Sequence, residues 1–526
     1  MPKSEPEFEF RKPGAIRVRF APSPTGNLHI GSARTGLFNF LFARKNQGIL
    51  ILRLEDTDKE RSKPEFEKDI IDSLKALGIE WDEGPDIEAD FGPYRQSKRT
   101  EIYKKYLNQL LTEKKAYHCF CSQEDLEAQK QYFLSIGQAP IYNGKCSNLT
   151  EKEVKKNLKE KKDFVIRFKV PKKKIIFKDL IRGEVEFDTD LIGDFVISKG
   201  QDFALYNFAC AVDDFEMKIS HVIRGEDHVS NTPKQILLQE ALGFPTPEYA
   251  HLPLILAPDR TKLSKRHGAI ALSDFLNKGY LSEALVNFIA FLGWNPGIER
   301  EIYSLASLIK EFSLERVKKG GAVFNIKRLD FLNGFYIRQK PIESLTKECI
   351  PFLVKEKLIK EKGDDEKAEF GSEGPEFKII ETKQEIEFEA LQKIVSIYKE
   401  RLKKLSELPK LVDFFFKERL EYNKELLKWK SQSDENIIAS IDKLTGVLSN
   451  IEDDNWTKEK LEEILAKEAE AFSAQAGGRI GDRGYLLWPL RVALTGKKAS
   501  ATPFEIAEIL GKEKVLKRLE QAKELI

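Results

Sequence analysis

Two short segments carry side chains whose types and spacing suit phosphate chemistry. The first reads FAPSPTGNLHIGSAR over residues 20–34, where a β-like segment gives way to a Pro/Gly loop and then to a helix that starts near His29. Free backbone N–H groups at such a start attract a phosphate, and His29 could donate a hydrogen bond to it. Gly31 would let a nucleotide approach the backbone closely. HIGS alone would suit a capping histidine in an ordinary connection, but the PSPTG context favours phosphate binding.

The second segment is the basic loop TKLSKRHG at 261–268. Three cations and a serine lie on it, and Gly268 is available for a tight turn; the polar side chains are Lys262, Ser264, Lys265 and Arg266. Such a loop can fold over a polyphosphate and neutralise charge that grows on a leaving group. A solvated basic loop is the alternative, but the position after an apolar strand-like run, downstream of the first segment, favours function.

Alternating strands and helices would position these segments. The hydrophobic patterns predict strands at 16–20, 49–54, 219–224 and 252–257, with helices between them. Ser62 and Glu65 have the spacing of a capping box that opens a helix ending at Gly78. This order predicts a parallel, doubly wound sheet.

Other regions follow different patterns. The stretch from about 115 to 200 holds three of the five cysteines, many lysines and short β-like runs, so we expect a domain inserted into the first. After about residue 275 the periodicity is almost wholly helical. Residues 355–390 are rich in Lys, Glu, Gly and Asp, and part of this segment is predicted to be a mobile polar insertion at the surface. Residues 1–14 are predicted to be a disordered extension.

Composition narrows the class of protein. A chain of 526 residues predicts about three to four domains. With 87 Lys plus Arg and 85 Asp plus Glu, the net charge of +2 excludes a globally cationic scaffold but not a local basic face for nucleic acid. The apolar runs are too short for a membrane span, and the charged N-terminus is no signal peptide. Five cysteines form no disulfide framework, which favours the reducing cytoplasm.

Six strings in one order carry a resemblance to a known family. The basic loop and the HIGS segment resemble the two signatures of class I aminoacyl-tRNA synthetases. The fuller strings are similar to bacterial-type glutamyl-tRNA synthetases: RFAPSPTGNLHIGSARTGLFNFLFAR, LRLEDTD, YRQSKR, YNFACAVDD, HVIRGEDHVSNTP and KLSKRHGA. The likeness runs from about 15 to 335 and returns at 489–519.

The resemblance implies a fold class with three parts. These are a Rossmann-type α/β catalytic domain, an inserted α+β domain that binds the tRNA acceptor end, and an all-α C-terminal half that binds the anticodon. The implied boundaries are 15–114 and 201–275 for the two catalytic segments, 115–200 for the insertion, 276–340 for a helical stem-contact region, and 341–526 for the anticodon-binding region.

The resemblance also implies a reaction. Glutamate would attack the α-phosphorus of ATP, and the terminal ribose of tRNA(Glu) would then take the glutamyl group. No enzyme nucleophile is needed, so catalysis is positioning plus electrostatic stabilisation. His29 and Lys265 would be the catalytic residues. Contacts with ATP are implied for His29, Gly31, Lys262, Ser264, Lys265 and Arg266, with Mg²⁺ bound through the phosphates.

Glutamate selection would follow from charge. Arg19 and Arg224 match substrate positions of the family, and an arginine that pairs with a carboxylate rejects neutral glutamine. Glu55 would pair with the substrate ammonium, and Ser23 and Tyr206 complete the match. Each could instead be an ordinary structural charge or polar group, but all fall at or near carboxyl ends of predicted strands, where parallel sheets bind ligands. The adjacent acids 213 and 214 receive no role.

The metal signal is incomplete. Cys119, Cys121 and Cys146 have the spacing of a zinc site found in some relatives. The fourth position holds Asn148, a poor zinc ligand, and His118 is too close in sequence to Cys119 for easy tetrahedral geometry. Three free thiols are favoured over structural zinc, and no metal ligand is assigned.

The expected partners are tRNA(Glu), L-glutamate and ATP, with no membrane and a monomeric chain. A shorter paralogue that modifies a tRNA base would lack the roughly 190 residues after 335. A catalytically silent RNA-binding paralogue would have no reason to keep the residues named above, and a lone nucleotidylyltransferase would not explain the helical half. Whether tRNA(Gln) is also charged with glutamate stays open.

Overall fold

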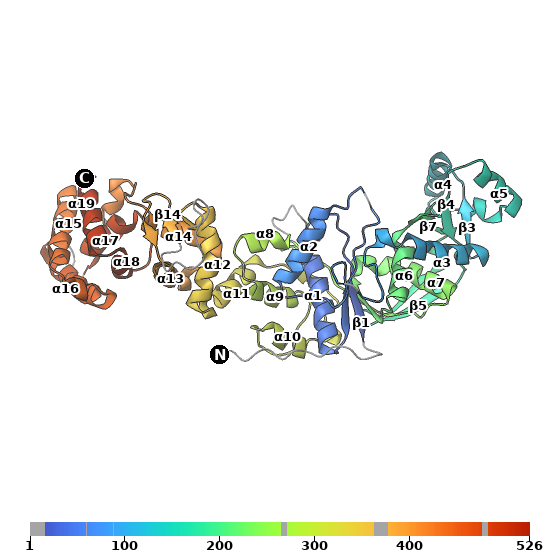
Figure 1. Cartoon of the computed structure of the whole chain (residues 1–526), viewed down its shortest axis with the longest axis horizontal. Coiled ribbons are helices and arrows are strands. Elements are labelled where there is room, and N and C mark those ends of the chain that lie inside the picture. The colour runs from blue at the N-terminus through green and yellow to red at the C-terminus, as the bar shows by residue number, and fades with distance from the viewer. Residues whose placement is uncertain (1–15, 59, 88, 265–270, 362–376, 476–481) are drawn as a thin grey trace, which may run out of the picture. The chain divides into compact units, whose positions relative to one another are not determined.

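The computed structural model describes residues 16–526 apart from 59, 88, 265–270, 362–376 and 476–481. The chain divides into two compact units (Figure 1). Unit 1 comprises Met1–Asn277 and Ser282–Leu332, and unit 2 comprises Lys278–Leu281 and Asn333–Ile526. The predicted extension at 1–14 lies outside the described residues.

A six-stranded sheet forms the centre of unit 1, in the order β2-β1-β9-β10-β5-β6. Its strands are β1 (Arg17–Phe20), β2 (Ile49–Leu52), β5 (Lys174–Asp179), β6 (Gly183–Asp188), β9 (His221–Gly225) and β10 (Glu248–Leu252). All neighbours pair in parallel except β5 and β6, which form an antiparallel edge. The predicted parallel sheet is therefore present, with one antiparallel strand added.

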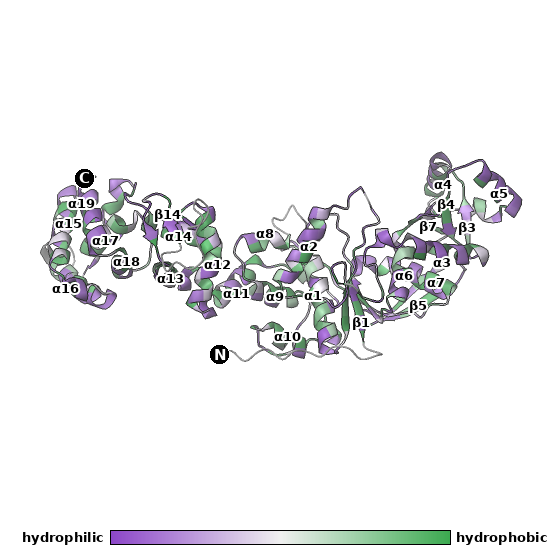
Figure 2. Ribbon diagram, viewed as in Figure 1, coloured by the Kyte–Doolittle hydropathy of each residue, from purple (hydrophilic) through white to green (hydrophobic). Residues whose placement is uncertain are grey.

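Helices cover this sheet and connect its strands. They include α1 (Ile30–Lys45), α2 (Pro64–Ala76), α3 (Thr100–Thr112), α6 (Tyr206–Glu216) and α7 (Thr232–Leu242). The predicted inner face of α1 is fully buried at Ala33, Leu37 and Leu41. Figure 2 shows hydrophobic residues along β1 and on parts of the helices that surround it. Because these faces are buried against the sheet, the position of α1 is fixed and its N-terminus lies at the sheet edge.

The stretch predicted as an insertion at 115–200 divides between two sheets. An antiparallel sheet in the order β3-β4-β7-β8 contains β3 (Ala116–Cys119), β4 (Val165–Phe168), β7 (Phe195–Lys199) and β8 (Phe203–Ala204), and is accompanied by α4 (Gln123–Ser135) and α5 (Glu151–Lys159). Strands β5 and β6, from the same stretch, instead join the central sheet. Alternating burial along β5 suits either sheet, so local pattern could not show which one it joins.

Unit 1 ends in a mostly helical segment. It contains α8 (Leu272–Asn277), α9 (Ser282–Ala290), α10 (Leu305–Glu311) and the start of α11 (Ile326–Gln339), together with the short parallel pair β11 (Ile255–Leu256) and β12 (Ala322–Val323). Within this part of unit 1 the expected helical character after about residue 275 is therefore present, with β12 as a short strand among the helices.

Unit 2 is mainly helical. Its helices after α11 are α12 (Ile342–Lys355), α13 (Phe388–Ser396), α14 (Leu408–Val412), α15 (Asp434–Ser449), α16 (Lys458–Gln475), α17 (Gly484–Thr495), α18 (Pro503–Leu510) and α19 (Lys512–Glu524). A small antiparallel sheet of β13 (Ile359–Glu361), β14 (Phe377–Ile379) and β15 (Glu385–Ile386) corrects the all-α prediction. These strands fall within the 355–390 segment. They were not predicted because the polar composition of the segment gave no clear strand pattern.

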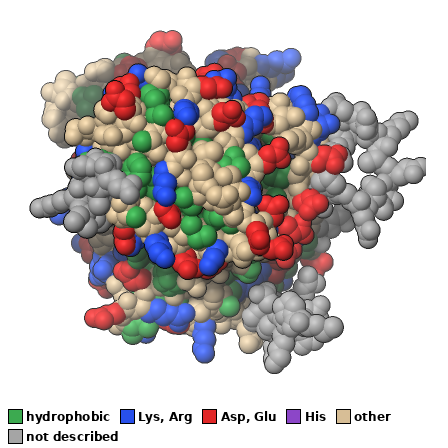
Figure 3. All heavy atoms as spheres, turned by 90° about the vertical axis from the view of Figure 1, so that its left-hand side faces the viewer, with side chains coloured by type: hydrophobic (Ala, Val, Ile, Leu, Met, Phe, Trp, Pro, Cys, Tyr) green, Lys and Arg blue, Asp and Glu red, His purple; other side chains and the backbone are tan. Residues whose placement is uncertain are grey.

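The surface of unit 2 carries both signs of charge. Figure 3 shows acidic and basic side chains intermixed over one face. Ion pairs on unit 2 such as Lys523–Asp442 and Lys443–Glu468 fit this mixture. Among the described residues, no helix is long and apolar enough to cross a membrane.

Candidate active site

A cavity of about 510 Å³ opens at the carboxyl ends of β1, β9 and β10. Open parallel sheets bind ligands at this edge. The structure brings eight of the predicted site residues around the cavity: Arg19, Ser23, His29, Gly31, Glu55, Tyr206, Arg224 and Lys262. Ser264 directly follows the lining residue Leu263. Lys265 and Arg266 lie outside the described residues.

His29 caps the helix α1 at the cavity wall. Its Nδ1 accepts hydrogen bonds from the backbone N–H groups of Gly31 at 3.1 Å and Ser32 at 3.2 Å. Because Nδ1 accepts, the imidazole proton sits on Nε2, which lies 2.9 Å from Ser32 Oγ. Burial lowers the pKa of His29, against the opposing charge of Asp227. The helix N–H groups that we expected to be free are therefore partly used by a neutral His29, and Nε2–H is the group with a proton to donate.

Arg224 is a buried guanidinium held by neutral groups. Its Nε donates to His251 Nε2 at 3.2 Å and its Nη2 to Thr232 Oγ1 at 2.8 Å. Nη1 is buried and, among the described residues, has no hydrogen-bond partner. Only 5% of Arg224 is exposed, and no carboxylate of the described chain pairs with it. Since a buried charge without a counter-ion is costly, this wall of the cavity suits an anionic ligand.

Arg19 differs because the protein already neutralises it. Arg19 Nε donates to Asp214 Oδ1 at 3.1 Å, and Arg53 Nη1 donates to the same oxygen at 2.6 Å. Burial would raise the pKa of Asp214, but the two arginines outweigh it and lower that pKa to about 2. Asp214 therefore stays charged and fixes Arg19 in place.

The neighbouring Asp213 has a structural role. It accepts hydrogen bonds from Arg99, Gln96 and Tyr103 and is fully buried. The two acids to which the sequence analysis gave no role therefore have different roles. Asp214 orients an arginine of the cavity, and Asp213 joins α6 to the start of α3.

Glu55 supplies negative charge to the same cavity. It is 6% exposed and accepts a hydrogen bond from Arg53 Nη2 at 3.1 Å. Burial raises the pKa of Glu55 despite Arg53 beside it. An approaching cation would favour its charged form.

The lining residues that the sequence analysis missed include Asp227, His228 and Asn231. The hydroxyl of Tyr206 lies 3.0 Å from His228 Nδ1. Burial, followed by the charge of Arg224, lowers the pKa of His228 to about 4. The sequence contains a signal that could have identified them. They belong to the polar string that follows Arg224, and this string marks the carboxyl end of the same strand.

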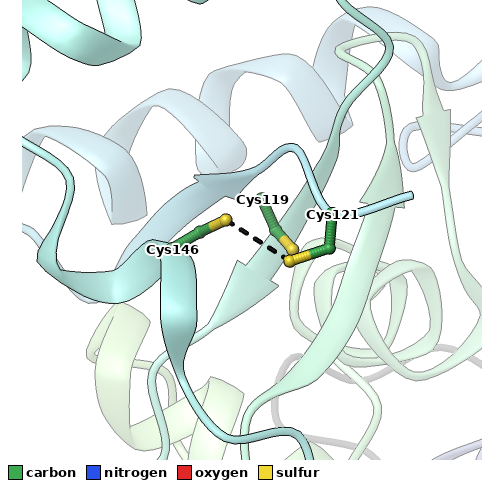
Figure 4. Close-up of side chains that lie close together, drawn as sticks. All are labelled: Cys119, Cys121 and Cys146. Atoms are coloured by element: carbon green, nitrogen blue, oxygen red, sulfur yellow. Dashed lines mark hydrogen bonds between the residues drawn. The ribbon is translucent and has the colours of Figure 1, made fainter. Parts of the chain in front are cut away.

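Three cysteines form a separate cluster beside β3 (Figure 4). The sulfur atoms of Cys119, Cys121 and Cys146 all lie within 4.8 Å of one another, and Cys121 Sγ is 3.6 Å from Cys146 Sγ. The Tyr142 hydroxyl lies 3.4 Å from the sulfurs of Cys119 and Cys121. Thiolates on one tetrahedral zinc ion stand about 3.8 Å apart. The cluster therefore fits zinc, with an oxygen of Tyr142 where the sequence analysis looked to Asn148.

Comparison with known proteins agrees with this architecture. The family model described as tRNA synthetases class I (E and Q), catalytic domain, matches residues 15–331, and the model described as an anticodon binding domain matches residues 345–523. The sheet, its cavity and the His29-capped helix, which all fall within residues 15–331, are therefore those of a class I aminoacyl-tRNA synthetase.

Individual relatives show to which family of this class the chain is similar. Glutamate--tRNA ligase 1 of Caldicellulosiruptor saccharolyticus is 47% identical over 96% of this chain and 98% of its own length. Glutamate--tRNA ligase of Carboxydothermus hydrogenoformans is 43% identical over 96% and 99%. The crystal structure of a glutamate tRNA ligase from Elizabethkingia meningosepticum in complex with its amino acid has a TM-score of 0.81 and 33% identity, covering 97% of this chain and 99% of that one. The chain belongs to the glutamate–tRNA ligase family.

Proposed function

We propose that this chain activates L-glutamate with ATP and transfers it to the 3′ end of tRNA(Glu), releasing pyrophosphate and AMP. The observation that carries the proposal is Arg224, a buried guanidinium whose Nη1 has no partner among the described residues. Glutamate and glutamine have nearly the same size, so charge must separate them. Glutamine would leave this guanidinium without a counter-ion.

The cavity supplies complementary charge for both ends of glutamate. We assign the side-chain carboxylate to Arg224, with Arg19 as a second and already neutralised cation nearby. Glu55 would hold the ammonium group, since it is the buried carboxylate on the wall near Arg19. Ser23 and Tyr206 would contact the substrate through their hydroxyl groups.

The reaction needs positioning rather than an enzyme nucleophile. An oxygen of the α-carboxylate attacks the α-phosphorus of ATP, the bond to the bridging oxygen breaks, and pyrophosphate leaves. His29 Nε2–H and Lys262 would stabilise the phosphates from the cavity wall, and Gly31 lets them approach α1. Lys265, with Ser264 and Arg266, would stabilise the departing pyrophosphate. A hydroxyl of the terminal ribose then attacks the glutamyl carbonyl, and AMP leaves.

A Mg²⁺ ion bound with ATP would screen the phosphate charge, which is the chemistry it supplies in this family. Mg²⁺ takes one or two carboxylates together with phosphates and water. Asp227 provides a carboxylate on the cavity wall that fits this need.

The remaining parts of the chain suit binding of tRNA. We assign the acceptor end to the region around the β3-β4-β7-β8 sheet, the stem to the helical segment that ends unit 1, and the anticodon to unit 2. A zinc ion at the cysteine cluster would be structural. It would hold the loop that carries Tyr142 and Cys146 against the end of β3.

The test is ATP–pyrophosphate exchange with the full chain in the presence of tRNA(Glu), because relatives generally activate glutamate only with tRNA bound. Exchange should depend on L-glutamate and be weak with L-glutamine at the same concentration. Equal exchange with both amino acids would contradict the assignment of Arg224 as the reader of the carboxylate.

A further inference from the structure

A fully buried histidine lies next to Arg224 without lining the cavity. His251 on β10 is paired in register with Arg224 on β9. Side chains paired in this way on parallel strands project from the same face of a sheet. His251 Nε2 lies 3.2 Å from Arg224 Nε and 3.0 Å from Thr232 Oγ1. His251 therefore contacts the guanidinium but is shielded from whatever occupies the cavity.

The contact fixes the tautomer of His251. A guanidinium N–H can only donate, so Nε2 must accept and carries no proton. The ring proton is then on Nδ1, which donates to Asp179 Oδ2 at 2.6 Å. Burial lowers the pKa of His251, although Asp179 opposes this shift. The histidine is thus neutral, with its acceptor lone pair directed at Arg224.

Asp179 is itself held rigidly at the end of β5. Its Oδ1 accepts the backbone N–H groups of Ile181 at 2.9 Å and Arg182 at 2.7 Å. The backbone N–H of His251 donates to Oδ2 at 3.1 Å. Burial would raise the pKa of Asp179, but the hydrogen bonds from the His251 ring and from the backbone of Arg182 and Ile181 lower it below its ordinary value. A charged carboxylate therefore anchors the histidine from the neighbouring strand.

A ring supports the arginine as well. The ring of Tyr249 lies 5.6 Å from the Arg224 guanidinium carbon, and it stacks at 6.0 Å and 8° on His251. Three adjacent strands, β9, β10 and β5, thus contribute Arg224, His251 and Asp179 to one chain of hydrogen bonds. The protein binds Nε and Nη2 of Arg224 through neutral acceptors and leaves Nη1 unpaired.

We propose that His251, held by Asp179, is a positioning residue that orients the Arg224 guanidinium and so sets the preference for glutamate over glutamine. The inference rests on the proposed function. A neutral acceptor serves this purpose better than a carboxylate would, because a carboxylate at position 251 would itself neutralise Arg224. The preference therefore depends on the hydrogen-bonding character of His251 and not only on its volume.

Two substitutions separate the two ring nitrogens. A glutamine amide reaches roughly where Nε2 lies, so His251→Gln keeps an acceptor for Arg224. An asparagine amide reaches only where Nδ1 lies, so His251→Asn keeps the bond to Asp179 and loses the acceptor. Losing a hydrogen bond to a charged group should raise the KM for glutamate about tenfold or more. We expect this rise in His251→Asn, a smaller rise in His251→Gln, and little change in the KM for ATP in either.

The tautomer gives an independent variant. In Asp179→Asn the amide N–H₂ can face His251 Nδ1, which then has to accept a hydrogen bond. The ring proton moves to Nε2, so that two donors, His251 Nε2–H and Arg224 Nε–H, face each other. The KM for glutamate should rise about tenfold or more, and the ratio of kcat/KM for glutamate over glutamine should fall. His221→Asn is the matched control for His251→Asn, because it replaces a histidine by asparagine on the neighbouring strand β9, outside the cavity, and should change neither value.

The outcomes separate the inference from the proposed function. If the unmodified chain does not charge tRNA(Glu) with glutamate, the proposed function fails. If it does, the two histidine variants decide the inference. Should His251→Asn and His251→Gln have the same KM for glutamate, while thermal melting shows that both are folded, His251 does not position Arg224. An unchanged glutamate-to-glutamine ratio in folded Asp179→Asn would likewise overturn the role of the tautomer.

Discussion

At the scale of single residues, the two buried arginines of the cavity differ in what the protein gives them. Arg19 has a carboxylate partner in Asp214, whereas the hydrogen-bond partners of Arg224 within the described part of the chain are the neutral side chains of His251 and Thr232. The sequence analysis identified both arginines from the family resemblance, supported by their places at predicted strand ends. It could not show this difference, because Asp214 and His251 lie 195 and 27 residues away along the chain from the arginines that they contact.

The first prediction concerns Arg224. In Arg224→Gln, glutamate should be weakened far more than glutamine, because the buried positive charge is gone. The ratio of kcat/KM values should shift towards glutamine by about 10² or more. The measurement is ATP–pyrophosphate exchange with glutamate and with glutamine, each in the presence of the same tRNA. Arg44→Gln is a control, since Arg44 pairs with Asp82 and does not line the cavity. An unchanged ratio in a folded variant would leave Arg19 as the main reader of the carboxylate.

The second prediction concerns Lys265, which belongs to the basic loop that the sequence predicts to bind the phosphates. Lys265→Ala should lower the rate of tRNA-supported pyrophosphate exchange by about 10²–10³, because one group that stabilises the transition state is lost. The KM for glutamate should change little, since glutamate selection is assigned to the other end of the cavity. Near-normal exchange would remove Lys265 from the mechanism.

At the scale of elements, hydrophobic pattern and turn residues predicted most of the strands and helices around the cavity. Pro233 lies in the first turn of α7, and Gly243 is its C-cap in the left-handed region at φ +74°. The capping box at Ser62 was wrong: Lys63 is the N-cap of α2, no side chain caps it, and Pro64 starts the helix. Proline at the first helical position fixes the backbone there, so it can decide the start without a side-chain cap.

Sheet membership was the part that local pattern could not supply. Strands β5 and β6 lie far from β10 in sequence and join it through a single parallel pairing at Tyr249 and Asp179. Pairing between distant segments depends on which faces are buried in three dimensions. The Asp179–His251 contact follows from that pairing, which is why sequence reasoning did not find it.

The cysteine cluster gives a prediction about an element junction. Sequence spacing favoured free thiols because Asn148 is a poor ligand, but Tyr142 adds an oxygen donor beside the sulfurs. We now expect about one equivalent of zinc in the purified protein, lost in Cys119→Ser with a lower melting temperature. Cys349→Ser is the control, since this buried thiol lies in unit 2. Elemental analysis that finds no zinc in the unmodified chain would restore the view of three free thiols.

At the scale of the whole molecule, the chain combines a unit suited to activating an amino acid with a second, mainly helical unit. The catalytic family model ends at 331 and the anticodon-binding model begins at 345, close to the boundary between the units at 332. Composition and periodicity predicted the helical second half. They did not predict its small sheet, because strands of two or three residues are too short for a clear pattern.

The most direct test is aminoacylation of purified tRNA(Glu) by the full chain with ATP and Mg²⁺. Labelled glutamate should become esterified to the 3′ end with release of AMP and pyrophosphate, while labelled glutamine should give little product under the same conditions. The same assay with tRNA(Gln) shows whether that tRNA is also charged with glutamate. Charging of tRNA(Glu) with glutamine as efficiently as with glutamate, or no charging with glutamate at all, would contradict the account.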